Sequence, residues 1–169
     1  MRKIILNLAV SLDGFIEGAN GEFDWCFVDQ DYGMTDFFNR IDTIFIGRKS
    51  YELISSMEGS SFPTFKSYVF SNTLDIDNEE ITVIKGDIVP QVIEIKNQKG
   101  KDIWLFGGSN LLTDFINFNL VDEMQISIHP ILLGQGKPLF LNIEGRKKWV
   151  LKNVKTYNTG LVQVFYEKT

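Results

Sequence analysis

The sequence is poor in cysteine and histidine and lacks a long hydrophobic run, and each shortage excludes a class of protein. Cys26 and His129 are the only residues of their types among 169, so neither an intrachain disulfide nor a zinc site built from cysteine and histidine can form. The apolar run near the N-terminus stops at Asp13, which leaves it too short to span a bilayer. We therefore expect a cytoplasmic protein, with no metal and no membrane partner.

Positive charge is also scarce. Lysine and arginine number 17 against 22 aspartate and glutamate residues, for a net charge of -5. Such a balance leaves no basic excess for nucleic-acid phosphates or anionic lipids. The composition, 44% hydrophobic and 13% aromatic, is typical of a chain with a substantial core. We expect one domain over residues 1–169 and no nucleic-acid partner.

The usual nucleotide and hydrolase motifs are missing. Neither G-x-G-x-x-G, nor a P-loop, nor a G-x-S-x-G elbow occurs. Two other glycine turns do occur, each between a buried-strand pattern and a helical pattern. Residues 43–46 lead into Gly47-Arg48-Lys49-Ser50, and residues 102–106 lead into Gly107-Gly108-Ser109. Turns of this kind let backbone N–H groups approach a phosphate, although each glycine could equally serve only to make a tight turn.

Hydrophobic periodicity predicts an α/β fold. Residues 3–10 form an apolar run that is typical of a central strand, and residues 67–71 and 81–84 read as further strands. Helices are predicted at residues 89–95 and 110–119. Strands that alternate with helices favour a largely parallel sheet.

Two further stretches complete the map. Phe37, Phe38 and Ile41 can share one helix face, with Thr35 or Asp36 as the N-cap. After a strand at 123–129, residues 149–157 and 161–167 predict an antiparallel hairpin at the edge of the sheet, and residues 13–24 predict a loop.

Several blocks carry a resemblance to a known family. They are LAVSLDGFI at 8–16, IFIGRKSYE at 44–52, VFSN at 69–72, IWLFGGSNLL at 103–112 and ILLGQGKPLF at 131–140. In this order they resemble the dihydrofolate reductase-like superfamily, and more closely its branch related to the reductase domain of the bifunctional riboflavin-biosynthesis enzyme. The resemblance implies a three-layer α/β/α fold with a mixed, mostly parallel sheet of about eight strands. It also implies bound NADPH and a homodimer.

The resemblance assigns roles along the cofactor. Ala9 and Ile16 would border the nicotinamide, and Gly18 and Asn20 would belong to the loop over it. The residues implied at the phosphates and the adenosine ribose are Gly47, Arg48, Lys49, Ser50, Ser71, Asn72, Gly107, Gly108, Ser109, Asn110 and Leu111, and Phe106 of the same block joins the cofactor-binding set.

The substrate side rests on acids and aromatic rings. Dihydrofolate reductases place an acid on the helix after the mobile loop, where Asp29, Asp31 and Asp36 are all available. Spacing does not decide among them; Asp31 and Asp36 are our candidates, with a pKa raised by burial, and solvated or capping acids are the alternative. Asp13 matches the branch's S-L-D-G segment and is expected to shape the active-site loop.

Trp25, Phe27 and Tyr32 form an expected aromatic wall for a flat ring, although such rings can equally be core. His129 is expected to be a strand-end residue and Cys26 an inert packed thiol.

These observations give one leading hypothesis and two rivals. The first is an NADPH-dependent reductase of a small heterocycle, nominally 5-amino-6-(5-phosphoribosylamino)uracil, as the resemblance implies. The second is a dihydrofolate or other pterin reductase. The third is a protein that binds a nucleotide or a partner on the same fold without turnover.

Overall fold

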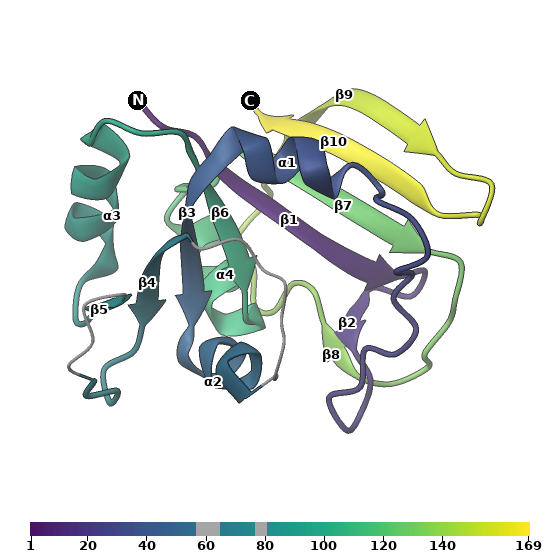
Figure 1. The fold of residues 1–169 in the computed structure, drawn as a ribbon, viewed down its shortest axis with the longest axis horizontal. Helices are drawn as coiled ribbons and strands as arrows, with labels where there is room; N and C mark the ends of the chain where they lie inside the picture. Colours follow the sequence, from purple (N-terminus) through teal and green to yellow (C-terminus); the bar gives the residue numbers. More distant parts are fainter. Residues whose placement is uncertain (57–64, 77–80) are drawn as a thin grey trace.

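The computed structural model describes residues 1–56, 65–76 and 81–169, and across these ranges the chain forms one eight-stranded mixed sheet (Figure 1). In sheet order the strands are β5 (Ile81–Ile84), β4 (Lys66–Phe70), β3 (Ile41–Gly47), β6 (Asp102–Gly107), β1 (Ile4–Ser11), β7 (Glu123–His129), β10 (Val162–Lys168) and β9 (Trp149–Thr156). Neighbours from β5 to β7 are parallel, whereas β10 pairs antiparallel with both β7 and β9. The predicted parallel sheet with an antiparallel edge hairpin is confirmed.

The central strands are apolar on both sides because both faces of the sheet are covered. In β1, Ile4, Ile5 and Leu6 are all at most 1% exposed, and Phe45 in β3 is fully buried. β1 lies between β6 and β7, which confirms the prediction that the first apolar run is a central strand.

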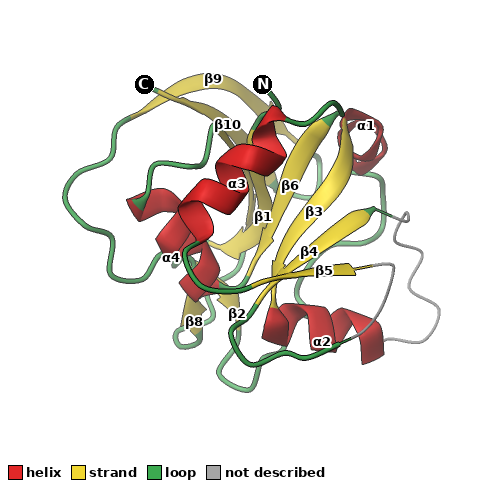
Figure 2. Cartoon of the chain, turned by 90° about the vertical axis from the view of Figure 1, so that its left-hand side faces the viewer, coloured by secondary structure: helices red, strands yellow, loops and turns green. Residues whose placement is uncertain are grey.

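Helices cover the two faces in pairs (Figure 2). On one face, α1 (Met34–Arg40) and α2 (Arg48–Ser56) pack around Trp104, and on the other, α3 (Ile88–Asn97) and α4 (Ser109–Asn117) pack around Phe45. Trp104 is 4% exposed, as expected of a core residue. The arrangement is the three-layer α/β/α sandwich that the sequence predicted.

The start of α1 differs from the prediction. Gly33, with φ of 79°, is the N-cap, and Thr35 and Asp36 lie inside the helix. The carboxylate of Asp31 already accepts hydrogen bonds from the backbone N–H groups of Gly33 and Thr35, so the chain turns into the helix earlier than either predicted cap. Ile41 does not belong to the helix but opens β3.

The loop expected at residues 13–24 contains a short strand, β2 (Phe15–Glu17), which pairs with β8 (Lys137–Pro138). This small antiparallel sheet joins two segments that lie more than a hundred residues apart. Within the described ranges, no helix is long and apolar enough to cross a membrane. The same ranges contain no cluster of three metal-ligating side chains.

Candidate functional site

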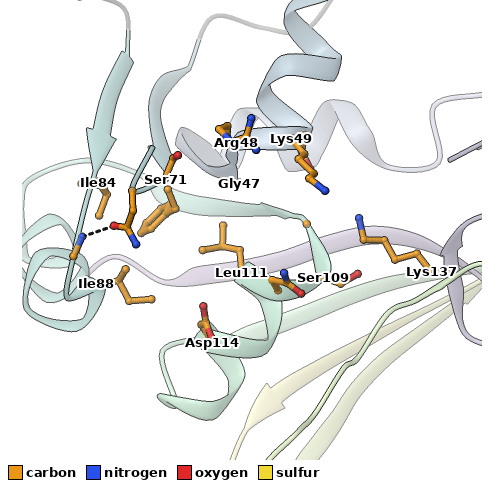
Figure 3. Close-up of a pocket in the computed structure, with 16 residues that line it drawn as sticks. Gly47, Arg48, Lys49, Ser71, Ile84, Ile88, Ser109, Leu111, Asp114 and Lys137 are labelled. Atoms are coloured by element: carbon orange, nitrogen blue, oxygen red, sulfur yellow. Dashed lines mark hydrogen bonds between the residues drawn. The ribbon is translucent and has the colours of Figure 1, made fainter. Parts of the chain in front are cut away.

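A pocket of about 400 Å³ lies where β3, β4 and β6 end (Figure 3). Its lining residues come from five separated segments of the chain: Gly47, Arg48, Lys49, Ser50, Phe70, Ser71, Asn72, Ile84, Gly86, Ile88, Gly108, Ser109, Asn110, Leu111, Asp114 and Lys137. Because β3, β4 and β6 are parallel, their carboxyl ends meet at one edge of the sheet, and the loops that follow them meet there too. Ligands of open α/β sheets bind at such an edge.

The two glycine turns lie against each other at this pocket. A Cβ atom on Gly47 would come within 3.4 Å of the carbonyl oxygen of Gly107, and one on Gly108 would lie 3.5 Å from the hydroxyl of Ser50. Gly107 has φ of 128°, which side-chain-bearing residues rarely adopt. α2 and α4 both begin at these turns, so their unpaired first N–H groups and positive dipole ends make this edge suited to an anion.

Three cationic side chains line the pocket. Arg48 pairs with Glu52 at 2.8 Å, and Lys137 pairs with Glu17 at 3.2 Å. Lys49 is exposed and has no ion pair within the described part of the chain. In Figure 3 the ammonium groups of Lys49 and Lys137 lie at the Ser109 end of the pocket. Partly exposed ion pairs are weak, so these cations can turn to an anionic ligand.

Ser71 and Asn72 shape the opposite wall. The Ser71 hydroxyl oxygen accepts hydrogen bonds from the backbone N–H groups of Thr73 and Leu74, at 3.2 and 3.0 Å. The Asn72 amide oxygen accepts one from Gly86 N–H at 2.9 Å, drawn as the dashed line in Figure 3. The amide nitrogen of Asn72 has no partner among the described residues, so it can donate a hydrogen bond to a ligand.

The other end of the pocket is apolar. Phe70, Ile84, Ile88 and Leu111 line it, and Phe70 and Ile84 are 9% and 5% exposed. Asp114 also lines the pocket, and burial raises the pKa of its carboxyl group. The pocket is therefore cationic and rich in N–H groups at one end and apolar at the other.

The structure brings together ten of the sixteen residues predicted to bind a cofactor. These ten line the pocket: Gly47, Arg48, Lys49, Ser50, Ser71, Asn72, Gly108, Ser109, Asn110 and Leu111. The other six are not among the lining residues. They are Ala9 on β1, Ile16 on β2, Gly18 and Asn20 in the turn after it, and Phe106 and Gly107 at the end of β6, of which Gly107 contacts Gly47 behind the lining. Phe106 packs on Trp104, with ring centroids 5.0 Å apart.

The prediction from the sequence did not include six of the lining residues, namely Phe70, Ile84, Gly86, Ile88, Asp114 and Lys137. Gly86 follows β5 much as Gly47 ends β3, and that repetition was a usable signal. Lys137 lies in the block at 131–140, to which only a structural role was given. Asp114 carried no local signal, because only the docking of α4 brings it to the pocket.

The predicted aromatic wall forms a cluster around His129. Trp25 and Phe27 lie 5.3 and 5.0 Å from the imidazole, measured between ring centroids, and Phe27 stacks on Tyr32 at 6.2 Å. Tyr32 is only 8% exposed and also packs on Tyr157, at 4.9 Å. The three predicted residues are thus together, beside the end of β7 and outside the lining of the glycine-turn pocket. The Nε1 atom of Trp25 is buried and has no hydrogen-bond partner in the described part of the chain.

His129 holds this cluster on the sheet. It is the last residue of β7, as predicted, and is 3% exposed. Its Nε2 accepts a hydrogen bond from the backbone N–H of Phe27 at 3.1 Å, and Nδ1 lies 3.2 Å from the carbonyl oxygen of Ser127. Nδ1 therefore carries the proton of a neutral ring. Burial lowers the pKa of His129.

The candidate acids are exposed. Asp31 lies two residues before the N-cap of α1, and its hydrogen bonds from Thr35 and Gly33 lower the pKa of its carboxyl group. Our expectation of a pKa raised by burial is therefore wrong for Asp31, because the carboxylate is in water and stabilised by donors. Asp36 lies exposed in the first turn of α1.

Asp13 ties two loops together. Its carboxylate accepts hydrogen bonds from the hydroxyl of Ser11 at 2.6 Å and from the backbone N–H groups of Leu133 and Gly134, at 3.1 and 2.7 Å. The bond from Ser11 is the largest cause of its lowered pKa. The carboxylate thus fixes the loop after β7 onto the end of β1.

A row of buried polar side chains lies under α1 and was not singled out from the sequence. Gln163 is 1% exposed; its amide nitrogen donates to the Ser127 hydroxyl at 2.9 Å and to the Tyr32 carbonyl at 3.3 Å. Asn7 and Gln125, paired in register on β1 and β7, are 5% and 8% exposed. The polar positions of the 123–129 alternation were the signal for this row.

Comparison with known proteins identifies the family. Residues 2–163 match the model of the RibD C-terminal domain. The chain belongs to this family. The match covers nearly the whole chain, so the resemblance predicted from the five sequence blocks is confirmed. Family membership supports an oxidoreductase in general.

Relatives of this RibD C-terminal domain agree in sequence and fold. The chain is 49% identical to the uncharacterized protein YyaP of Bacillus subtilis strain 168, over 98% of this chain and 94% of that protein. It is 25% identical, with a TM-score of 0.89 and 99% of each chain covered, to a structure named "Putative riboflavin biosynthesis protein" from Shewanella sp. PV-4. Dihydrofolate reductase from Enterococcus faecalis, complexed with NADP(H) and RAB-propyl, has a TM-score of 0.72 at 15% identity, with 99% of this chain and 96% of that chain covered. The predicted dihydrofolate reductase-like fold is confirmed.

Proposed function

We propose that the protein is an NADPH-dependent reductase of a small heterocyclic substrate. The observation that carries this proposal is the pair of glycine turns, which meet at one pocket beneath the N-termini of α2 and α4. Close backbone approach, free N–H groups and nearby cations are what two linked phosphates require. When bound, the cofactor supplies the hydride, and the chain supplies binding and orientation.

The donor set fits a phosphorylated dinucleotide. The backbone at Gly108 and Ser109 offers N–H groups for the pyrophosphate, and Lys49 and Lys137 offer ammonium groups close by. Arg48 and the free amide nitrogen of Asn72 are available to a phosphate on the adenosine ribose. An arginine can engage such a phosphate with two parallel hydrogen bonds, which is the basis for preferring NADPH to NADH.

For the substrate we propose 5-amino-6-(5-phosphoribosylamino)uracil or a close relative. The family resemblance and the relative named for riboflavin biosynthesis support this class. A pterin reductase needs a desolvated acid on the helix after the loop, whereas Asp31 and Asp36 are both exposed. We therefore prefer the ribosylaminopyrimidine to dihydrofolate.

We also propose a cytoplasmic homodimer. The lone cysteine suits a reducing compartment. β9 is an edge strand, and Val150, Leu151 and Val154 on it are 44%, 51% and 45% exposed. A long edge strand with exposed apolar residues is a ready template for pairing with another chain, and a second copy offers the same strand in return.

The first experiment is a titration of the protein with NADPH and with NADH, followed by tryptophan fluorescence. We expect saturable binding that is tighter for NADPH. Replacing Arg48 by alanine should weaken NADPH binding by about 1.5–3 kcal/mol, the value of a charge-assisted hydrogen bond. Arg146→Ala removes an equally charged, exposed side chain outside the pocket and should leave affinity unchanged.

Turnover then separates the substrates. NADPH oxidation in the presence of the ribosylaminopyrimidine, and not of dihydrofolate, is the expected result. If protein that melts cooperatively binds neither nucleotide, the glycine turns are only turns and the reductase proposal fails. If NADPH binds but Arg48→Ala and Arg146→Ala behave alike, the phosphate does not lie at the first turn.

A further inference from the structure

Asp114 is the one acidic side chain among the lining residues that the structure describes. Phosphates repel a carboxylate, so an anionic ligand gives no reason for this residue to be there. Three cations and two helix N-termini line the same pocket and all favour negative charge. The carboxylate is therefore available to a different, hydrogen-donating part of the ligand.

Its position separates it from the phosphate end. Asp114 lies five residues after Ser109 on α4, which at 1.5 Å per residue is about 7–8 Å along the helix axis. Figure 3 shows it below Leu111, on the side of Ile88, while Lys137 lies at the opposite end of the pocket. A ligand group that contacts Asp114 therefore lies away from phosphates bound at Ser109, by about the width of a ring system.

Apolar side chains surround that end. Phe70, Ile84, Ile88 and Leu111 offer apolar surface for the faces of a flat base. They offer no hydrogen bond to its edge. Among these neighbours Asp114 alone carries a charged polar group.

Asp114 is an exposed residue of the pocket lining. No hydrogen bond or ion pair joins its oxygens to any residue in the ranges 1–56, 65–76 and 81–169. Partial burial raises the pKa of the group, so water solvates it less than a free side chain. An ionised carboxylate only accepts hydrogen bonds, so its partner must be a donor.

We propose that Asp114 selects the base of the bound dinucleotide by accepting a hydrogen bond from the exocyclic amino group of adenine. The inference rests on the proposed function and adds to it the choice of base. Hypoxanthine carries a carbonyl oxygen at that position, which cannot donate and would face the carboxylate. Adenine is therefore favoured over hypoxanthine at otherwise identical phosphates and riboses.

The test compares NADPH with its hypoxanthine analogue, reduced nicotinamide hypoxanthine dinucleotide phosphate, in fluorescence titrations. We expect the wild-type chain to bind NADPH about 10-fold more tightly, the order expected when a charged acceptor loses its donor at a partly exposed site. In Asp114→Asn the amide can rotate to accept from an amine or donate to a carbonyl, so the two affinities should become equal within about twofold.

Glu94→Gln is the matched control. It removes the same charge from an exposed position on α3 that does not line the pocket, and it should keep the wild-type preference. The quantity compared is the ratio of the affinities for NADPH and for its hypoxanthine analogue. Loss of a carboxylate can strengthen the binding of both anionic nucleotides, but an equal gain for both leaves this ratio unchanged.

The outcomes distinguish the two proposals. If neither nucleotide binds, the reductase function and this inference fall together. If both nucleotides bind equally to the wild type, NADPH binding stands and the base-selecting role of Asp114 is overturned. If Asp114→Asn weakens both nucleotides by the same factor, the carboxylate contacts a ribose hydroxyl and not the base.

Discussion

Gly136 lies where a side chain has no room. A Cβ atom there would come within 2.2 Å of the carbonyl oxygen of Glu17, at a φ of 151°. The close approach is what lets β8 pair with β2 and brings Lys137 to the pocket. Gly136 therefore allows β8 to pack against β2, although the two strands are far apart in the sequence.

Replacing Gly136 by alanine should lower the free energy of unfolding by about 1–3 kcal/mol, because the backbone must move to relieve the overlap. Urea unfolding at neutral pH measures this. Gly145→Ala is the control, since that glycine has φ of 67° but open space around its Cβ position. An equal loss in both variants would mean that backbone conformation, and not the contact with Glu17, limits the site.

At the scale of elements, His129 connects β7 to the segment that carries the aromatic cluster. Its neutral Nε2 accepts the Phe27 N–H, and a protonated ring could not. Burial lowers the pKa of His129 in the folded chain, so below about pH 6.5 the unfolded chain binds the proton more readily. The contribution of the neutral ring to the free energy of unfolding is complete above about pH 6.5. It is lost as the pH falls from there through the lower pKa of His129 in the folded chain.

We therefore expect the free energy of unfolding to fall between pH 7.5 and 5.5, with a slope of at most about 1.4 kcal/mol per pH unit for one proton. The chain has no other histidine, so the assignment is direct. Urea unfolding of the wild type and of His129→Asn at both pH values measures it. A wild-type stability that does not change over this window, or an equal change in the variant, would contradict the role of His129.

The elements that the sequence predicted well are those with strong local patterns. Residues 3–10 and 102–106 are largely apolar runs of strand length, and the glycine turns after residues 46 and 106 follow such runs, so half of the pocket was visible from local signals. β2 and β8 escaped because each is two or three residues long and exists only through its partner. The prediction looked for a cap whose own side chain accepts a hydrogen bond, so it missed Gly33. In the structure the carboxylate of Asp31, two residues earlier, accepts the hydrogen bonds of Gly33 N–H and Thr35 N–H instead.

The candidate site shows the same division. Arg48, Lys49 and Ser109 follow strands directly, and strand order alone places them at one edge. Lys137 and Asp114 reach the pocket only through packing, of β8 on β2 and of α4 on the sheet. The alternation at residues 123–129 indicated that Gln125 shares one face with other polar residues, but only the packing of α1 on that face buries Asn7 and Gln163.

At the scale of the whole molecule, the exposed edge strand β9 is where we expect a second copy of the chain to bind. If two copies pair there, the protein should elute as a species of about 39 kDa, twice the chain mass of 19.4 kDa. Leu151→Lys places a charge among the exposed apolar residues of β9, where burial against a second copy would leave it unpaired.

We expect Leu151→Lys to be monomeric in size-exclusion chromatography with light scattering. Ile93→Lys, which makes the same change at a 45% exposed position on α3, should remain dimeric. A monomeric wild type would refute the homodimer, and a Leu151→Lys variant that stays dimeric would move the interface away from β9. Because the glycine-turn pocket is built within one chain, NADPH affinity should be the same in the monomeric variant as in the wild type, and a loss of binding on dissociation would show that the partner completes the site.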